Sequence, residues 1–429
     1  MPTLPPIARV RQVFDGPRVP NVPEAIADAI RASRIRERIR PGGSVALTVG
    51  SRGIAGIDLI TRSAVSTLRS LGFAPFVVAA MGSHGGGTAE GQRAMLAEFG
   101  VTEARVGCPI VSDMETLVLG ESSIGLPIRF DRNAFEADGI VLLNRIKPHT
   151  SFTGRYESGL LKMLTIGLGK REGAAQVHKL GLLGLKTLLP EVGAFLLANT
   201  KVALGIGLLE NAEETMARVV AIEPEDLLRV EPELLDESRL LMGRLPFDQI
   251  DVLIVGELGK NYSGTGLDPN VIGRQRVETM PDLPRPVVTR LAVLDVSAES
   301  RGNALGVGLA DLTTERLVRA IDPVPMRVNS LTSNLLTRAR VPLSLRTDRD
   351  VIAACLDTCW RTAWSEARVV FIPNTLELMT MWITHPLAGE AAVETDFAPM
   401  PISPSGDLDQ EAMFPESVRG RRRAGVRQG

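Results

Sequence analysis

The sequence feature that most constrains the fold is a repeated alternation of short apolar runs with longer helical patterns. The run SVALTVG (44–50) ends in glycine, the helical pattern IDLITRSAVSTLRSLG (57–72) follows it, and a second run, APFVVAA (74–80), comes next. Two apolar runs joined by an amphipathic helix are typical of a strand, helix, strand unit. The further runs GIVLLN (139–144) and KVALGIGLL (201–209) extend the alternation. We therefore predict an α/β fold with mostly parallel sheets covered by helices.

The alternation is interrupted once, which predicts two domains. A charged stretch occupies residues 222–248, and the apolar run DVLIVGE (251–257) then restarts the pattern. A chain of 429 residues is also long enough for more than one hydrophobic core. We predict α/β domains over 1–245 and 246–385, with the active site in the cleft between them. Residues 386–429 are rich in proline, glycine and charge, so we expect a peripheral extension with a basic tail.

Composition excludes several classes of protein. Apolar residues make up 44% and charged residues 23%, which is the balance of a soluble globular protein. A formal net charge of -2 gives no electrostatic attraction to nucleic acid or to an anionic membrane. The three cysteines show no metal-binding spacing, and neither a signal peptide nor an apolar run of 18 residues is present. We therefore expect a cytoplasmic protein without nucleic-acid or membrane partners.

Polar residues directly after each apolar run are candidates for a site, because open α/β sheets bind ligands beyond the carboxyl ends of their strands. The candidates in the N-terminal domain are Ser51, Arg52, His84, Lys147 and His149. Those in the second domain follow DVLIVGE and are Lys260, Asn261, Tyr262 and Ser263.

His84 lies in the glycine-rich loop GSHGGGT (82–88), before a helix that Thr88 can cap and that closes at Gly100. Glycines let the backbone approach a ligand closely, and a helix N-terminus favours an anion. The loop matches neither of the phosphate-binding motifs, G-x-x-x-x-G-K-[ST] and G-x-G-x-x-G. By itself it fits a ligand-binding loop and a turn with a surface histidine equally well.

The stretch NRIKPHTSFTGRYESGLLKMLTIGLGKREGAAQVH (144–178) holds two of the four histidines and one of the two tyrosines of the chain. Pro148 keeps Lys147 extended, which projects His149 from the end of a strand. Lys162 lies among apolar residues of a helical pattern. There it either extends its amine to water or is a nucleophile whose pKa is lowered by desolvation.

Three histidines, His84, His149 and His178, are candidates for acid/base work or for a metal site. Neutral imidazole is the commonest metal ligand and a usual acid or base near neutral pH. The three could also form the ligand set of a zinc hydrolase. The fourth histidine, His385, lies apart from them in the sequence and is interpreted as structural.

Together these segments resemble the lactate racemase family, whose members use a nickel-pincer nucleotide cofactor. The ordered parts are the arginine of GSRG (50–53), a histidine in GSHGGGT thirty-two residues later and the PH of IKPH. They continue with S-G-x-x-K over residues 158–162 and a histidine sixteen residues beyond that lysine. The resemblance covers roughly residues 45–180 and is looser across the rest of the chain.

The resemblance implies a role for each matching residue. Lys162 would carry the cofactor, a pyridinium mononucleotide with sulfur-containing arms, as a thioamide, and His178 would be the nickel ligand. His84 and His149 would be the paired acid/base residues. Other positions implied for cofactor binding are Gly50, Ser51, Arg52, Ser158 and Ile166. Arg52 would also orient the substrate. Further candidates for substrate contact are the strand-end residues of the second domain, Lys260, Asn261, Tyr262 and Ser263.

The activity implied by the resemblance is racemisation or epimerisation of a 2-hydroxy acid. The substrate hydroxyl would lose its proton to one histidine while hydride leaves C2 for the cofactor, and the flat keto acid would be reduced from either face. Cofactor-synthesis proteins would be needed for loading. A non-catalytic nucleotide-binding protein of the same fold is a further alternative to the isomerase and the zinc hydrolase.

The sequence departs from the family pattern in three places. The spacing from His149 to Lys162 is three residues longer than in typical lactate racemases, and the added turn contains Arg155, Tyr156 and Glu157. The strand-end arginine is followed by Gly53 instead of the usual proline. The family's substrate-contacting glutamine and lysine have no matching positions in the second domain. These departures favour a substrate with more polar groups than lactate.

Overall fold

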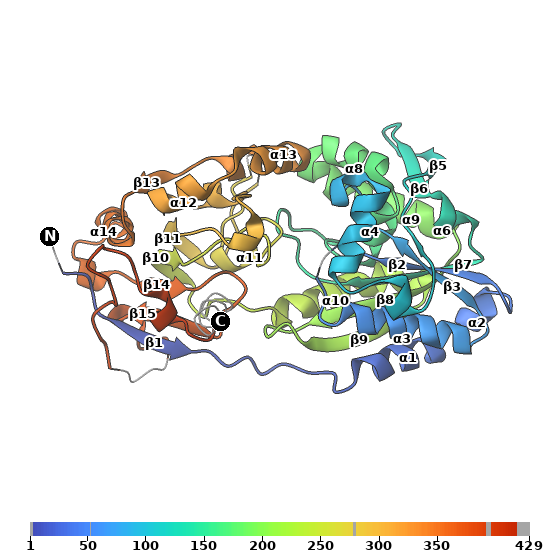
Figure 1. Ribbon diagram of the computed structural model, residues 1–429, viewed down its shortest axis with the longest axis horizontal. Coiled ribbons are helices and arrows are strands. Elements are labelled where there is room, and N and C mark those ends of the chain that lie inside the picture. The colour runs from blue at the N-terminus through green and yellow to red at the C-terminus, as the bar shows by residue number, and fades with distance from the viewer. Residues whose placement is uncertain (1–2, 52, 278–279, 392–395, 418–429) are drawn as a thin grey trace. The chain divides into compact units, whose positions relative to one another are not determined.

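The computed structural model describes residues 3–51, 53–277, 280–391 and 396–417 (Figure 1). Contacts divide the chain into two compact units, Gly16–Met242, and Met1–Asp15 together with Gly243–Gly429. Each unit is built on one large sheet. Within the described ranges, no helix is long and apolar enough to cross a membrane.

The sheet of the unit Gly16–Met242 has six strands in the order β4-β3-β2-β7-β8-β9. All neighbouring strands are parallel except β8 and β9, which confirms the predicted mostly parallel sheet. Strands β5 and β6 form a separate antiparallel pair. The strands are β2 (Ser44–Val49), β3 (Ala74–Ala79), β4 (Ile110–Val111), β5 (Thr116–Glu121), β6 (Pro127–Asp131), β7 (Gly139–Arg145), β8 (Val202–Glu210) and β9 (Met216–Ile222).

Helices cover this sheet and bury an aliphatic core with little aromatic content. Side chains such as Leu47 and Val49 of β2 pack with Ile60 and Leu68 of α3, and all four are at least 99% buried. The helices are α1 (Val22–Ala32), α2 (Ile35–Arg38), α3 (Ile57–Ser70), α4 (Ala89–Glu98), α5 (Glu103–Val106), α6 (Arg132–Glu136), α7 (Leu160–Lys162), α8 (Lys170–Lys179), α9 (Gly181–Asn199) and α10 (Leu227–Leu241).

The sheet of the second unit has seven strands in the order β1-β15-β14-β10-β11-β12-β13. The five strands from β14 to β13 are parallel, and β15 and β1 add antiparallel pairs at one edge. Its strands are β1 (Ile7–Arg11), β10 (Gln249–Val255), β11 (Val287–Val293), β12 (Leu312–Thr314), β13 (Leu343–Leu345), β14 (Val369–Ile372) and β15 (Thr380–Thr384). Its helices are α11 (Pro269–Ile272), α12 (Glu315–Ala320), α13 (Pro323–Ser333), α14 (Asp348–Thr358) and α15 (Gln410–Met413).

The structure differs from the predicted domain division at both ends of the chain. Residues 1–15 belong to the second unit, because β1 pairs along its length with β15. The described part of the predicted peripheral extension, 386–429, also contributes to that unit's core. Met413 and Phe414 are buried against Val252 and Phe371 in one apolar cluster. Local sequence patterns carry no information about such distant pairings.

Candidate functional site

Three parallel strands bring the N-terminal candidates to one edge of the first sheet. Strand β2 lies between β3 and β7, and both pairings are parallel. Ser51 follows β2, His84 follows β3 and His149 follows β7. The two histidines therefore come from strands on opposite sides of the strand that leads to Ser51. This edge holds the carboxyl ends of the strands, where open α/β sheets bind ligands.

A hydrogen bond joins the loops after β2 and β3. The Ser51 hydroxyl is bonded to Nδ1 of His84, and the histidine side chain is exposed. Buried Gln92 of α4 holds the loop after β3, since its Nε2 donates to the carbonyl oxygens of Gly82 (3.0 Å) and His84 (3.3 Å). Thr88 accepts from Gly91 N at 3.1 Å and caps α4 as predicted.

Both strand-end loops pack against the segment that follows Lys162. This segment, η2 (Met163–Gly167), is π-helical, a rare form that occurs frequently at functional sites. The amide of Gly82 donates to the Gly167 carbonyl at 3.1 Å. A Cβ at Gly50 would lie 3.0 Å from Cε of Met163, so the residue without a side chain permits this close approach.

Lys162 is the last residue of the short helix α7, and its side chain is half-buried between fully buried neighbours. The preceding turn is tied to β7, because Asn144 Nδ2 donates to the Gly159 carbonyl at 2.9 Å. The sequence left open whether this lysine extends to water or reacts. The half-buried position is compatible with both, and the lysine stays a predicted attachment point.

Glu231 of α10 holds the start of the lysine-bearing helix. Its Oε2 accepts from Leu161 N at 2.9 Å, and the whole residue is 1% exposed. A Cβ at Gly159 would lie 2.3 Å from Oε1, so the glycine of S-G-x-x-K makes room for this carboxyl group. Burial raises the pKa of Glu231 to about 7, against the opposing effect of the backbone amides of Leu161 and Leu160. Sequence reasoning missed this residue, since it lies in a charged stretch typical of a solvated linker.

The loop that carries His149 is closed by a pair of backbone hydrogen bonds between Lys147 and Ser158, at 2.9 and 3.3 Å. Glu157 lies inside this loop and is 2% exposed. Its carboxylate accepts from the backbone amides of His149 (2.6 Å) and Gly154 (2.9 Å). Burial raises the pKa of Glu157, although these amides and Arg239 act in the opposite direction.

Two predicted residues lie wholly or partly outside the described part of the chain. Arg52 is outside the described residues. His178 belongs to α8 by its backbone, but its side chain is outside the described residues. Helix α8 begins at the buried Lys170, whose Nζ donates to the Ala79 carbonyl and pairs with Asp131 Oδ2, each at 2.8 Å.

No group of three or more His, Cys, Asp or Glu side chains that could hold a metal occurs within the ranges that the structure describes. The nickel role of His178 and the alternative zinc set both include a side chain outside those ranges. Both stay predictions.

The remaining cofactor candidates, Ser158 and Ile166, border the Lys162 turn. Ser158 is half-buried and pairs with Lys147 through its backbone. Ile166 is 7% exposed within η2. Both lie four residues from Lys162 in the sequence, and they stay predicted cofactor-binding residues.

The substrate candidates of the second unit form a hydrogen-bonded loop after β10. Nζ of Lys260 donates to the Gly264 carbonyl at 2.9 Å and to Asn329, and Asn261 accepts from Ser297 Oγ at 2.7 Å. Tyr262 is buried, and its hydroxyl donates to Glu257 at 2.6 Å. Burial, followed by the bond to Glu257, raises the pKa of Tyr262.

Ser263 is 7% exposed, and its Oγ lies 3.3 Å from Thr265 Oγ1. The buried side chains of Tyr262 and Ser263 therefore maintain the loop, whereas Lys260 and Asn261 are the more accessible members.

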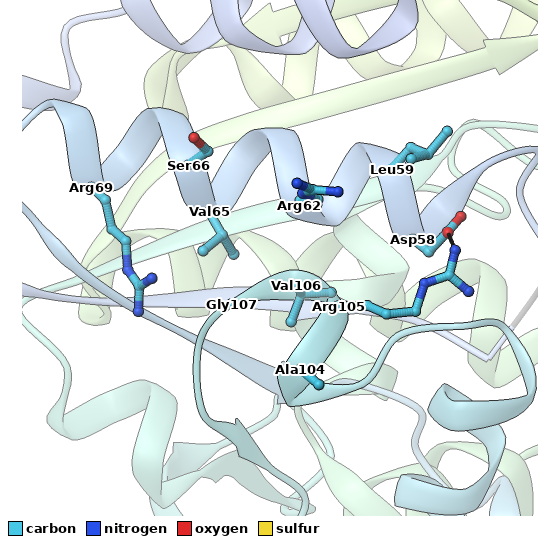
Figure 2. Close-up of a pocket in the computed structure, with 10 residues that line it drawn as sticks. All are labelled: Asp58, Leu59, Arg62, Val65, Ser66, Arg69, Ala104, Arg105, Val106 and Gly107. Carbon is cyan, nitrogen blue, oxygen red and sulfur yellow. Dashed lines mark hydrogen bonds and ion pairs between the residues drawn. The ribbon is translucent and has the colours of Figure 1, made fainter.

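A surface hollow of about 450 Å³ lies between α3 and α5 (Figure 2). Its lining includes Arg62, Arg69 and Arg105, and Arg105 pairs with Asp58. None of the residues predicted for catalysis or cofactor binding lines it. The hollow therefore shares no lining residue with the strand-end site.

Comparisons with known proteins point to one family. Residues 15–186 match the family model of the lactate racemase N-terminal domain, a range that contains the strand-end residues and Lys162. A search of curated proteins finds no match. Among solved structures, the lactate racemase apoprotein from Thermoanaerobacterium thermosaccharolyticum is similar, with a TM-score of 0.53 and 10% identity over 86% of this chain and 99% of that chain. At this identity the likeness concerns the fold.

Proposed function

This chain belongs to the lactate racemase family, and from that membership we propose that it racemises or epimerises a 2-hydroxy acid. The family supports an isomerase function in general terms. The observation that carries the specific proposal is the Ser51–His84 hydrogen bond at the carboxyl edge of the sheet. The His149 loop leaves the same edge after β7, which neighbours β2 on the side opposite β3. A substrate held near the end of β2 would have a histidine on each side.

The proposed cofactor is the nickel-pincer nucleotide of the family, with Lys162 as its attachment point and His178 as its nickel ligand. The residues around Lys162 fit such a group in two respects. Lys162 is half-buried between buried apolar neighbours, a position that is compatible with an amine that attacks a cofactor. The glycine-containing loops after β2 and β3 both contact η2, the segment that follows Lys162, through Gly50 and Gly82. When bound, the cofactor would supply a hydride acceptor for the hydrogen at C2.

The chain's own residues would move the hydroxyl proton. Ser51 can donate to or accept from Nδ1 of His84, so the serine can form a hydrogen bond with this ring in both of its protonation states. His149 differs, because its Nδ1 accepts from Ser151 N at 3.1 Å. The neutral His149 ring then carries its proton on Nε2. We propose that His84 accepts the proton of the hydroxyl group in one direction, while the neutral His149 donates a hydrogen bond from Nε2 to the substrate oxygen on the other side. To give a proton to the keto oxygen, His149 must enter the turnover as the imidazolium, for which Ser151 N has to release Nδ1.

The test is a comparison of His84→Ala and His149→Ala with the parent protein, each produced together with cofactor-synthesis proteins. Both variants should lose isomerisation by about 10² or more, while the mass of the attached cofactor stays unchanged. Full activity in either variant would contradict the acid/base assignment.

A further inference from the structure

The added turn in the His149 loop, Arg155, Tyr156 and Glu157, is more than a spacer. We infer that Glu157, held by Arg239 of α10, is a positioning residue that fixes the backbone and ring tautomer of His149. The inference rests on the proposed function only for its effect on activity, since the geometry it concerns exists without cofactor or substrate.

The hydrogen bonds of Glu157 hold the loop that carries His149 and connect it to Arg239. Oε2 accepts from His149 N at 2.6 Å, and Oε1 accepts from Gly154 N at 2.9 Å. Nη2 of Arg239 donates to Oε1 at 2.6 Å and to the Gly154 carbonyl at 3.4 Å. One carboxylate thus connects the backbone at His149 with the backbone at Gly154. Because it is 98% buried, losing a partner would leave an uncompensated charge inside the protein.

The fixed backbone in turn determines how the imidazole is held. With the amide of His149 bound to Glu157, the chain turns so that Ser151 N donates to His149 Nδ1 at 3.1 Å. The imidazole also packs on the fully buried ring of Phe152, with 4.5 Å between centroids. A backbone amide can only donate, so Nδ1 must accept and the neutral ring holds its proton on Nε2.

The turn is docked on α10 (Leu227–Leu241) at two points that are about three helical turns apart. The Tyr156 hydroxyl donates to the Leu228 carbonyl at 2.6 Å, and Arg239 pairs with Glu157. Two of the three added residues therefore anchor the loop, while Arg155 is exposed. The longer spacing between His149 and Lys162 is used to build this anchor.

Histidine NMR tests the inference on the full-length protein without cofactor. The chain has only four histidines, so the ring signals can be assigned with His→Gln variants. In the parent protein, His149 should show the neutral Nε2–H tautomer. Glu157→Gln replaces an acceptor oxygen with an NH₂ group that faces amide donors. It should convert His149 to a mixture of tautomers and leave His84, His178 and His385 unchanged.

Glu223→Gln is a matched control. Glu223 also accepts from a backbone amide, Arg34 N at 2.9 Å, and pairs with an arginine, Arg38 at 3.1 Å, but it contacts none of the predicted site residues. This variant should leave the His149 signals unchanged. In cofactor-loaded protein, Glu157→Gln should lower kcat by up to about a hundredfold, as a misplaced catalytic group does, with a smaller change in KM.

Arg239→Gln keeps the test decisive if Glu157→Gln fails to fold. The Arg239 side chain is 32% exposed, and a glutamine there can still donate a hydrogen bond to the buried carboxylate. The change should therefore be milder than Glu157→Gln, and it should move the His149 signals in the same direction. Unchanged His149 signals in folded Glu157→Gln or Arg239→Gln protein would overturn the inference. A failure of the proposed function looks different, because every variant, including the parent, would lack isomerase activity while the His149 signals still respond.

Discussion

Ser51 and His84 come from loops after two neighbouring parallel strands, and a hydrogen bond between the serine hydroxyl and Nδ1 of the histidine joins them. Ser51→Ala removes a partner that can serve both protonation states of the ring. A hydrogen bond worth about 1 kcal/mol corresponds to a decrease of about fivefold in kcat/KM. Ser66→Ala, an exposed position on α3, should match the parent protein, and equal effects of both substitutions would contradict a specific role for Ser51.

Lys162→Ala tests the attachment point of the cofactor. Protein produced together with cofactor-synthesis proteins should carry an adduct of mononucleotide mass, and this substitution should abolish it because the amine is the attacking group. Lys186→Ala, which changes an exposed lysine on α9, should keep the adduct. Intact-mass spectrometry measures both. An adduct that survives in the Lys162 variant would place the attachment elsewhere.

His178→Ala separates the metal from the tether. The variant should retain the adduct on Lys162 but lose nickel, because a metal site that lacks one imidazole ligand binds its ion weakly. Elemental analysis beside intact mass gives both quantities, and His385→Ala is the histidine control. Undiminished nickel in the His178 variant would rule out this ligand.

Glu231 predicts a pH-dependent stability. Its folded-state pKa of about 7 lies above the ordinary value of 4.5, so the folded protein keeps a proton that the unfolded chain releases. Stability must therefore decrease as the pH rises from about 4.5 to about 7, by up to about 3 kcal/mol. Glu231→Gln cannot ionise and should lack this decrease. Urea unfolding of parent and variant at pH 5 and pH 8 measures the difference; identical pH responses would show that Glu231 does not titrate in this range.

Strands β2, β3, β7, β8 and β10 could be predicted from the sequence because their apolar runs are local signals. Strand β7, for example, ends where GIVLLN meets its first charged residue, Arg145. The strand-end rule also selected Ser51, His84 and His149, since sequence order alone places each of them after a predicted strand. The hydrogen bond between Ser51 and His84 follows from the pairing of β2 with β3, which sequence patterns do not specify.

The buried charged residues could not be predicted. Glu157, Glu231 and Lys170 are each at least 98% buried, yet charged residues in polar stretches are typical of solvated surface. Their burial depends on partners from distant segments, such as Arg239 for Glu157 and Asp131 for Lys170. Tyr262 is the opposite case, a residue predicted to be accessible that is buried. Its place after β10 indicated substrate contact, whereas its hydroxyl donates to Glu257 within the loop.

We propose that this chain isomerises a 2-hydroxy acid with histidines that move only the hydroxyl proton. The most direct measurement supplies cofactor-loaded protein with single isomers of 2-hydroxy acids deuterated at C2, chosen to include acids more polar than lactate. Chiral chromatography with mass spectrometry then follows both the configuration and the label. We expect the opposite isomer to form and to keep most of its deuterium, because the C2 hydrogen does not pass through water. Rapid loss of deuterium to solvent, or no isomerisation of any acid by protein that carries the adduct on Lys162, would contradict the proposal.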